Sequence, residues 1–436
     1  MATDPGDMLA TERMGPAQIV AVVLCVLLNA LDGFDVLSIS FASPGIAHEW
    51  GIERGALGVV LSMELIGMAI GSLALGRAAD RFGRRPIIIA CLIVMASGMF
   101  LAARATSVET LLAYRFVTGL GIGGMLACVN AMVAEYANNR YRSFAVMIMA
   151  AGYPLGAIVG GAVSSRLLAT FDWRAVFILG GVATAALLPL VLLLLPESVA
   201  YLAVRRPPNA LNRINAVLKR LGHRVIDALP AAQEKTGKGG FASLFSPTLV
   251  KTTILLTIAY FTHIMTFYFI IKWIPKLVVD MGHAPPEAGN VLVWANVGGA
   301  TGAIMFGVLT RRIDVRWLVI AALAGSFALV ALFGRGQADL VGLSLVSAIA
   351  GFFTNAAVVG LYALVAGYFP TEVRAGGTGF VIGLGRGGAA LGPIAAGYLF
   401  QSGQGLQIVS LVMAAGSVVA LVALLLLGKP RGVVAA

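Results

Sequence analysis

The sequence predicts an all-α integral membrane protein with twelve spanning helices in two pseudo-symmetric halves of six. Of its 436 residues, 59% belong to the apolar set and only 12% are charged, whereas soluble domains carry about 45–50% apolar and about 25% charged residues. The apolar residues fall into twelve runs, each long enough to supply the ~20 residues that a helix needs to cross a bilayer. One long polar interval separates the first six runs from the last six.

The predicted N-terminal half, residues 1–195, contains spans at 17–43, 55–79, 86–104, 109–136, 142–168 and 174–195. Residues 196–248 are the predicted cytoplasmic linker loop. The predicted C-terminal half, residues 249–436, contains spans at 249–275, 287–310, 316–335, 338–368, 373–400 and 405–428. Each half therefore has the same number of helices, which favours an internal repeat.

Basic residues orient these spans in the membrane. With both termini in the cytoplasm, 22 of the 31 Lys and Arg residues lie on the cytoplasmic side and 6 on the opposite side. This asymmetry follows the positive-inside rule, so we expect a multi-pass protein of a bacterial inner membrane with cytoplasmic termini. The net charge of +11 is then explained by the loops, and no nucleic-acid partner is expected.

Weak repeats relate the two halves and indicate a transporter. Gly152, Gly156 and Gly161 in the fifth span are matched, 236 residues later, by Gly388, Gly392 and Gly397 in the eleventh. Two equivalent six-helix halves are typical of transporters that bind their substrate between the halves near the membrane midplane. Small-residue repeats also pack helices closely, and for these glycines packing is the favoured direct role.

Several chemistries are disfavoured by what the sequence contains. The three cysteines, Cys25, Cys91 and Cys128, all lie in apolar runs, so no disulfide framework and no metal cluster is expected. The phosphate-binding pattern GxxxxGK[ST] does not occur, which argues against an ATP-driven pump. We therefore expect neither an enzyme nor a bound cofactor.

A short loop between the second and third spans carries a motif with a physical rationale for gating. It contains Gly76, Asp80, Arg81, Gly83 and Arg84 in the order G-x-x-x-D-R-x-G-R. The glycines allow the turn to approach a neighbouring helix, and the aspartate can pair with a cation or a helix N-terminus across a gate. The motif resembles the signature loop of the major facilitator superfamily, which implies the fold of that superfamily.

Two acids in the middle of the first span narrow the choice within the superfamily. Asp32 and Asp35 are three residues apart and lie on one helix face. Such acids are costly in hydrocarbon and are expected to face a watery cavity. Close carboxylates resist ionising together, so one is expected to hold a proton reversibly. The alternative is a hydrogen-bonded helix kink at Gly33.

The Asp-Gly-Phe-Asp motif occurs together with two further motifs around the eleventh span. These are Pro370-Thr371-Glu372-Val373-Arg374 before it and Gly383-Leu384-Gly385-Arg386 within it. The combination resembles the aromatic acid/proton symporter family over nearly the whole chain. The resemblance implies that Arg386 takes part in substrate handling, and its fork of donors suits a carboxylate.

Further residues complete the predicted proton-coupling and gating sets. Arg115, followed by spaced glycines, resembles a superfamily motif in which the arginine is linked to proton transfer, and we group it with Asp32, Asp35 and Glu135. Glu135, close to Arg140 and Arg142, parallels Glu372 and Arg374, which we assign to the gate together with the loop motif. Solvated helix ends are the alternative interpretation of these charge pairs.

The seventh span supplies candidate substrate contacts in addition to Arg386. Lys272, His263 and Tyr268 lie in this span, and Tyr362 lies in the tenth. Lys272 either binds an anion or extends to the outer surface, and Glu64 is its candidate partner. It lies three residues before Pro275, which is expected to end the helix. His263 is either a cavity residue or a packing residue, and the tyrosines either stack on an aromatic ring or pack.

Together these features predict a secondary transporter that imports an aromatic carboxylate with protons by alternating access. Hydroxybenzoates and lignin-derived acids with one or two carboxylates are the expected substrates. Protons and the lipid bilayer are the other expected partners, and the protein is expected to be a monomer. One alternative is an efflux antiporter, although Ala157 stands where the antiporter motif would have proline. Another is a non-transporting membrane sensor, for which residues 196–248 offer too short a soluble stretch.

Overall fold

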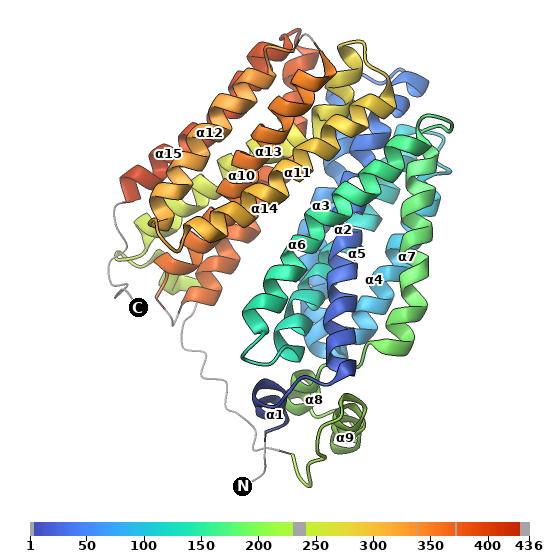
Figure 1. The fold of residues 1–436 in the computed structure, drawn as a ribbon, viewed down its shortest axis with the longest axis vertical. Helices are drawn as coiled ribbons and strands as arrows, with labels where there is room; N and C mark the ends of the chain where they lie inside the picture. The colour runs from blue at the N-terminus through green and yellow to red at the C-terminus, as the bar shows by residue number, and fades with distance from the viewer. Residues whose placement is uncertain (1–3, 230–240, 338, 371–372, 428–436) are drawn as a thin grey trace. The chain divides into compact units, whose positions relative to one another are not determined.

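The computed structural model describes residues 4–229, 241–337, 339–370 and 373–427. All regular structure within these ranges is helical, and twelve helices are long and apolar enough to span a membrane (Figure 1). They are α2 (Pro16–Trp50), α3 (Arg54–Phe82), α4 (Arg84–Ala102), α5 (Val108–Tyr136), α6 (Arg142–Leu167), α7 (Arg174–Leu194), α10 (Val250–Asp280), α11 (Pro285–Leu309), α12 (Val315–Phe333), α13 (Leu340–Tyr368), α14 (Arg374–Gln401) and α15 (Leu406–Leu427). The predicted fold class, a multi-pass all-α membrane protein, is confirmed.

The helices group into two compact units. Unit 1 is made of Met1–Val36, Gly67–Ala157 and Phe177–Lys235. Unit 2 is made of Leu37–Ile66, Ile158–Val176 and Thr236–Ala436. One end of α2, of α3 and of α6 thus belongs to unit 2, together with the second half of the chain. The predicted division of the sequence into two six-helix halves, separated by a linker at residues 196–248, is a different division and stays a prediction.

In unit 1, glycines bring the backbones of α2 and α6 together. A Cβ added at Gly156 would overlap the carbonyl oxygen of Ala30, and one at Gly33 would overlap the carbonyl oxygen of Tyr153. The amide of Asn29 also donates to the carbonyl of Met149 at 2.5 Å. The packing role predicted for the glycines of the fifth span is therefore confirmed at Gly156.

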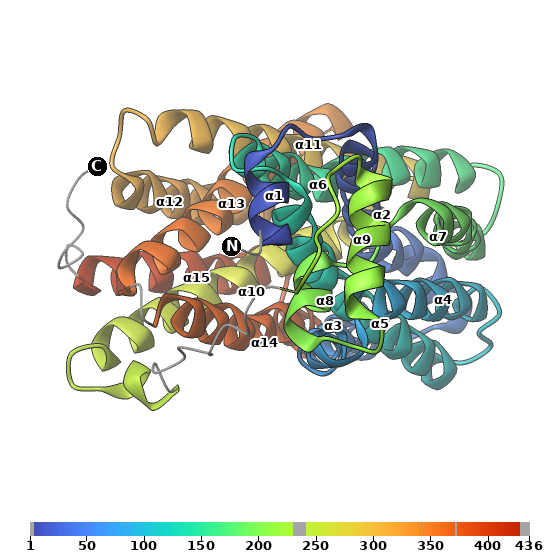
Figure 2. The ribbon, with the colours of Figure 1, turned by 90° about the horizontal axis from the view of Figure 1, so that it is seen from below.

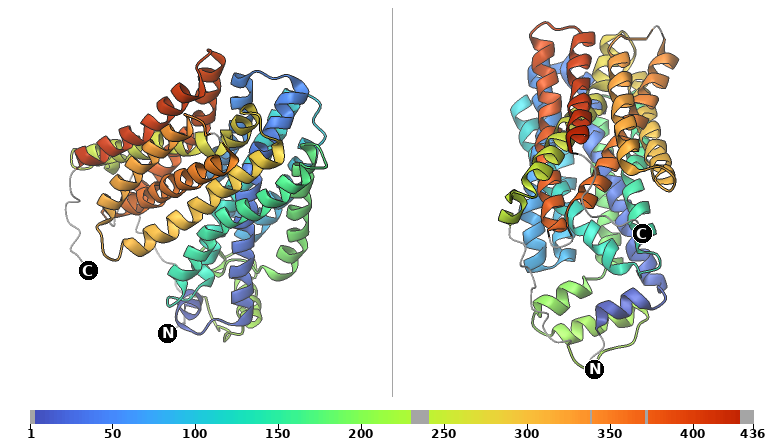
Figure 3. Two further views of the ribbon diagram at one scale, coloured as in Figure 1. Left: turned by 45° about the horizontal axis from the view of Figure 1, so that its top comes forward. Right: turned by 90° about the vertical axis from the view of Figure 1, so that its left-hand side faces the viewer.

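In its described part, the interval predicted to be a loop contains two short α-helices, α8 (Val199–Arg205) and α9 (Ala210–Leu221), in addition to a 3-10 turn near its end. Together with α1 (Pro5–Thr11) the two α-helices gather at one end of the long helices of unit 1 (Figures 2 and 3). In α9 the buried residues recur at helical spacing: Ala210, Ile214, Leu218 and Leu221. Because α9 is only twelve residues long, it is too short to be read as a span. The assignment of residues 196–248 as a cytoplasmic linker stays a prediction.

In unit 2, α10 lies along α14 and α15, and α11 lies along α13. The short 3-10 helix η1 (Phe241–Phe245) packs against α10 and α14. The expectation that Pro275 ends the seventh span is wrong, because α10 continues through it to Asp280. Proline is tolerated inside spanning helices because neighbouring groups satisfy the backbone carbonyl that it leaves without a donor.

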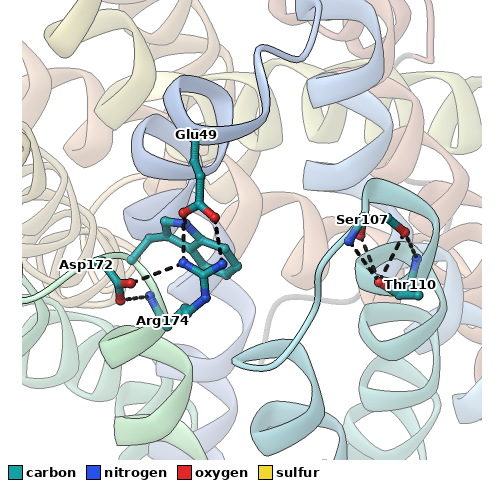
Figure 4. Close-up of polar contacts among 6 residues, drawn as sticks. Glu49, Ser107, Thr110, Asp172 and Arg174 are labelled. Carbon is teal, nitrogen blue, oxygen red and sulfur yellow. Dashed lines mark hydrogen bonds and ion pairs between the residues drawn. The ribbon is translucent and has the colours of Figure 1, made fainter.

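Polar contacts fix the ends of several spans, as Figure 4 shows for two separate places. In unit 1, α5 begins at a capping box in which the hydroxyl of Ser107 accepts from the backbone N–H of Thr110 at 3.3 Å. In unit 2, the carboxylate of Glu49 accepts from both terminal nitrogens of Arg174, at 2.7 and 2.8 Å. This ion pair holds the extension of α2, beyond its predicted end at residue 43, against the start of α7.

Candidate functional site

The two acids of the first span are buried in unit 1. Asp32 is 2% exposed and Asp35 is fully buried. Gly33, which lies between them in the sequence, faces the backbone of α6. Both acids therefore lie on sides of α2 other than the one that faces α6. A Cβ added at Gly180 of α7 would lie 3.0 Å from a carboxylate oxygen of Asp35. Asp35 therefore points toward α7, within the unit to which both belong.

Arg115 of α5 lies beside Asp35. It is fully buried, and its Nη2 donates to the backbone carbonyl of Asp35 at 3.0 Å. Its Nη1 donates to the sulfur of Met99 at 3.1 Å, and its guanidinium lies over the ring of Phe177 at 5.4 Å. The structure thus brings two of the four residues predicted for proton coupling, Asp35 and Arg115, into contact. Asp32 precedes Asp35 by three residues on α2, and we call Asp32, Asp35 and Arg115 the acid–arginine cluster.

The fourth, Glu135, belongs to a different cluster. Its carboxylate pairs with Arg84 at the start of α4 and accepts a hydrogen bond from the hydroxyl of Ser198. These contacts place Glu135 with the predicted gating residues rather than with the acid–arginine cluster. Its predicted role in proton coupling stays a prediction.

A carboxylate that the sequence analysis missed organises this second cluster. One oxygen of Glu197 accepts from the backbone N–H groups of Arg84 at 3.0 Å, Arg85 at 3.2 Å and Ser198 at 2.8 Å. Glu197 therefore caps the positive N-terminus of α4. The signal available in the sequence was an acid directly after an apolar span, followed by a serine that can cap the next helix.

Gly83 is required by the same geometry. Its φ of +107° lies in the region that favours glycine, and a Cβ there would overlap the carboxylate of Glu197. Gly76 differs, because a Cβ added to it would meet only Ala127 at 3.7 Å, an ordinary contact. The close approach predicted from the two glycines therefore holds at Gly83 in this structure, and the gating role of Gly76 stays a prediction.

Asp80 and Arg81 lie at the surface beside α8. The carbonyl of Asp80 accepts from Arg205 at 2.7 Å, and the carbonyl of Arg81 accepts from the hydroxyl of Tyr201 at 3.2 Å. The side chain of Asp80 is exposed and helps to line a cavity of about 260 Å³ with Arg84. Asp80 is thus accessible for an ionic contact in another conformation, as its predicted gating role requires.

In unit 2, Lys272 of α10 lies near Glu64 of α3. The Nζ of Lys272 is 3.9 Å from Oε2 of Glu64, and both side chains are fully buried. The alternative in which Lys272 extends to the outer surface is therefore not adopted in this structure. The candidate partner named from the sequence is the residue that the structure places beside it.

His263 occupies the interior of the helices of unit 2. Its Nε2 lies 2.9 Å from the carbonyl of Thr354 and its Nδ1 lies 3.0 Å from the hydroxyl of Ser417, which in turn lies 3.0 Å from Ser326. The imidazole is fully buried. These contacts favour the packing interpretation, while substrate contact by His263 stays a prediction.

Arg386 lies in α14 and is half-buried. The preceding Gly385 leaves room for the ring of Tyr260, whose hydroxyl donates to that of Tyr362 at 2.9 Å. Tyr362 is 42% exposed, so it is accessible for contact with a ligand. Tyr260 is a candidate missed among the predicted site residues, and its contact with Tyr362 links α10 to α13.

The remaining predicted residues add less. Tyr268 stacks edge-on with Phe267, at 5.3 Å between ring centroids. Arg374 begins α14 and donates from its Nε to the carbonyl of Phe369 at 3.3 Å. Glu372 lies outside the described residues, so its predicted pairing in the gate stays a prediction.

In the part of the chain that the structure describes, twelve helices are long and apolar enough to span a membrane, and α2, α3, α5 and α10 carry buried charges, as is typical of a polytopic membrane transporter. Residues 25–283 and 256–435 match the Major Facilitator Superfamily. The chain belongs to this superfamily and is a transporter rather than an enzyme.

Characterised relatives agree with the narrower resemblance to aromatic acid transporters. The 4-hydroxybenzoate transporter PcaK of Pseudomonas aeruginosa is 33% identical over 89% of this chain and 88% of its own. A gallate transporter of Pseudomonas putida is 32% identical over 98% and 96%, respectively. The 3-(3-hydroxy-phenyl)propionate transporter of Escherichia coli is 30% identical over 94% and 93%.

A solved structure shares the fold at low sequence identity. It is a bacterial homologue of the human lysosomal transporter Spinster, crystallised in an inward-facing and occupied conformation. The TM-score is 0.73 with 15% identity, and the alignment covers 94% of this chain and 97% of that one. This likeness supports the fold and carries no information on substrate.

Proposed function

We propose that this chain imports an aromatic carboxylate together with protons by alternating access across a bacterial inner membrane, with both termini in the cytoplasm. The observation that carries the proposal is the buried hydrogen bond from Arg115 to the backbone carbonyl of Asp35, which places an arginine beside two buried acids in a chain whose relatives are named as transporters of 4-hydroxybenzoate and gallate. A buried acid next to an arginine changes its interactions when it gains a proton, which is the requirement for a coupling site.

The acid–arginine cluster is the coupling site in this proposal, and Arg386 binds the substrate carboxylate. An arginine is always charged and offers two parallel donors to a carboxylate. Tyr362 and Tyr268 contact the aromatic ring. Lys272 supplies a second cation, which contacts the carboxylate of a monoacid together with Arg386 and the second acidic group of a diacid. The gate consists of the loop motif from Gly76 to Arg84 with Arg374 and Glu372.

Uptake into proteoliposomes tests this proposal. Vesicles with an alkaline interior should accumulate radiolabelled 4-hydroxybenzoate, gallate or 3-(3-hydroxyphenyl)propionate, and a protonophore should abolish the accumulation. An efflux antiporter would instead take up substrate when the interior is acidic, and a non-transporting sensor would take up none under either gradient.

Arg386→Ala should lose transport of every aromatic acid in the panel. Removing one partner of a desolvated charge pair costs about 2–5 kcal/mol, or roughly tens to thousands of fold in affinity. Arg335 provides a control, because it lies in the turn after α12, and Arg335→Ala should transport normally. Normal transport by Arg386→Ala would place carboxylate recognition elsewhere.

A further inference from the structure

One end of α3 is joined to α10 and α14 within unit 2. Nη2 of Arg54 lies 3.0 Å from Oδ2 of Asp280 at the end of α10. A Cβ added at Gly58 would lie 2.5 Å from the carbonyl oxygen of Pro393, and one at Gly397 would lie 2.6 Å from that of Arg54. We call this contact, from Arg54 to Glu64, the α3 seam.

Glu64 and Lys272 form the inner end of the α3 seam. Glu64 follows Arg54 by ten residues, about 15 Å along the helix. Two fully buried opposite charges compensate each other, because either one alone would be costly to bury. Their separation of 3.9 Å is longer than the roughly 2.7–2.9 Å of a close charge-assisted hydrogen bond. The two charges are therefore within ion-pair range of each other, on two different helices.

The two partners are anchored to different helices. Trp273, next to Lys272, is fully buried and donates from its indole N–H to the carbonyl of Pro393 at 3.1 Å. Lys272 is thus fixed to the α10–α14 pair, whereas Glu64 is carried by α3. If α3 separates from α10, Glu64 leaves with it and Lys272 stays with α14.

We propose that Glu64 is an internal competitor for the substrate carboxylate at Lys272. Glu64 holds Lys272 while the α3 seam is closed, and a carboxylate of the substrate replaces it when the seam opens. This inference rests on the proposed transport of aromatic carboxylates and adds a residue that tunes affinity and closes the seam. Without substrate, opening would separate two opposite charges with no anion to replace Glu64 at the ammonium, so the seam stays closed and leakage is limited.

Competition predicts opposite effects of neutralising the two partners. The apparent affinity for a ligand falls by the fraction of molecules that are competent to bind it. Glu64→Gln removes the competitor and should lower the dissociation constant at least threefold. The size of the change is set by the fraction of wild-type molecules in which Glu64 occupies Lys272. Lys272→Met removes the anion site and should raise the constant by about tenfold or more.

Equilibrium binding of radiolabelled 4-hydroxybenzoate and gallate to the full chain in lipid nanodiscs measures these constants. Glu53→Gln is the matched control: it makes the same charge change beside Gln401, outside the buried part of the seam, and should bind as the wild type does. If the ion pair is purely structural, Glu64→Gln and Lys272→Met should either both weaken binding or both leave it unchanged. Either result would overturn the proposal.

A second measurement separates failure of this inference from failure of the proposed function. Leu61 is fully buried one turn from Glu64 on the same face of α3, so Leu61→Cys reports opening through reaction with a membrane-impermeant maleimide. Cys25, Cys91 and Cys128 are buried and give little background. Both neutralised variants should react several-fold faster than the parent Leu61→Cys chain.

If neither variant reacts faster, the pair does not close the seam, and the inference is wrong even in a chain that binds both probes. If the wild type binds neither probe, the proposed substrate class is wrong, and faster labelling of both variants would still show that the pair closes the seam.

Discussion

The acid–arginine cluster of unit 1 and the Glu64–Lys272 pair of unit 2 are both buried, but they are held in different ways. In the first, Arg115 bonds to the backbone of the helix that carries the acids, at 3.0 Å. In the second, two side chains face each other at 3.9 Å across helices that are joined by glycine contacts. The first arrangement is suited to a change of protonation without movement, and the second to a change of partner through movement.

The comparison implies that the two regions have different roles, protonation in unit 1 and exchange of ionic partners in unit 2. Asp35, Arg115 and the helix contacts around Gly33 all lie within unit 1, so a proton can be gained there while the helices stay packed. Glu64 lies near the point where α3 passes from unit 2 to unit 1. Substitutions of Gly33 and of the two acids test whether the first cluster is as firmly built as its contacts indicate, and substitutions of Glu197 and His263 test two sites outside it.

The largest effect is expected from Gly33→Ala. The added methyl group would overlap the carbonyl oxygen of Tyr153, so α2 and α6 must move apart, at a cost of about 3 kcal/mol or more. Thermal unfolding and the yield of the purified protein should both fall, and transport should be lost. Gly307→Ala is the control, since a Cβ there meets nothing within 4 Å and should leave stability unchanged or slightly higher. Equal stability of the two variants would show that α2 and α6 are not held by this contact.

Next in size is the effect of Asp32→Asn and Asp35→Asn on coupling. Asparagine keeps the shape of the side chain but cannot exchange a proton, so uphill accumulation in vesicles with a pH gradient should fall to simple equilibration. Exchange of labelled for unlabelled substrate, measured without a gradient, should continue at a reduced rate. Accumulation by both variants would move the coupling site away from the acid–arginine cluster.

The division between what the sequence predicted and what it missed follows from the range of the interactions. Spans were predictable because hydropathy over about 20 residues decides whether a helix resides in the bilayer. Asp32 and Asp35 were expected to face a watery cavity, whereas both are buried in this structure, because which face of a span packs against other helices depends on contacts between residues far apart in the chain. Glu197 was missed because its partner Arg84 lies 113 residues away, and nothing local specifies that contact. The continuation of α10 past Pro275 was missed because it depends on neighbouring helices.

Glu197→Gln tests whether the third ionic site, at the start of α4, is as strongly held as the acid–arginine cluster. The variant keeps one acceptor oxygen but loses the negative charge that faces three backbone N–H groups, at a cost of about 1–3 kcal/mol. We expect a lower unfolding temperature and faster proteolysis of the loop around Arg84. Glu109→Gln serves as the control, since Glu109 is a surface acid in the first turn of α5. Identical proteolysis of the two variants would contradict a structural role for Glu197.

The smallest effect on transport is expected from His263→Gln. A carbonyl only accepts, so the contact with Thr354 requires the proton on Nε2, and the neutral ring then accepts from Ser417 through Nδ1. Glutamine supplies a donor and an acceptor, and we expect the KM for 4-hydroxybenzoate to change by less than about twofold, with stability within about 1 kcal/mol. His263→Leu removes both bonds and should lower stability by about 1–3 kcal/mol with the KM still unchanged. If both variants instead raise the KM several-fold without loss of stability, His263 contacts the substrate, and unit 2 contains a polar binding residue beyond Arg386 and Lys272.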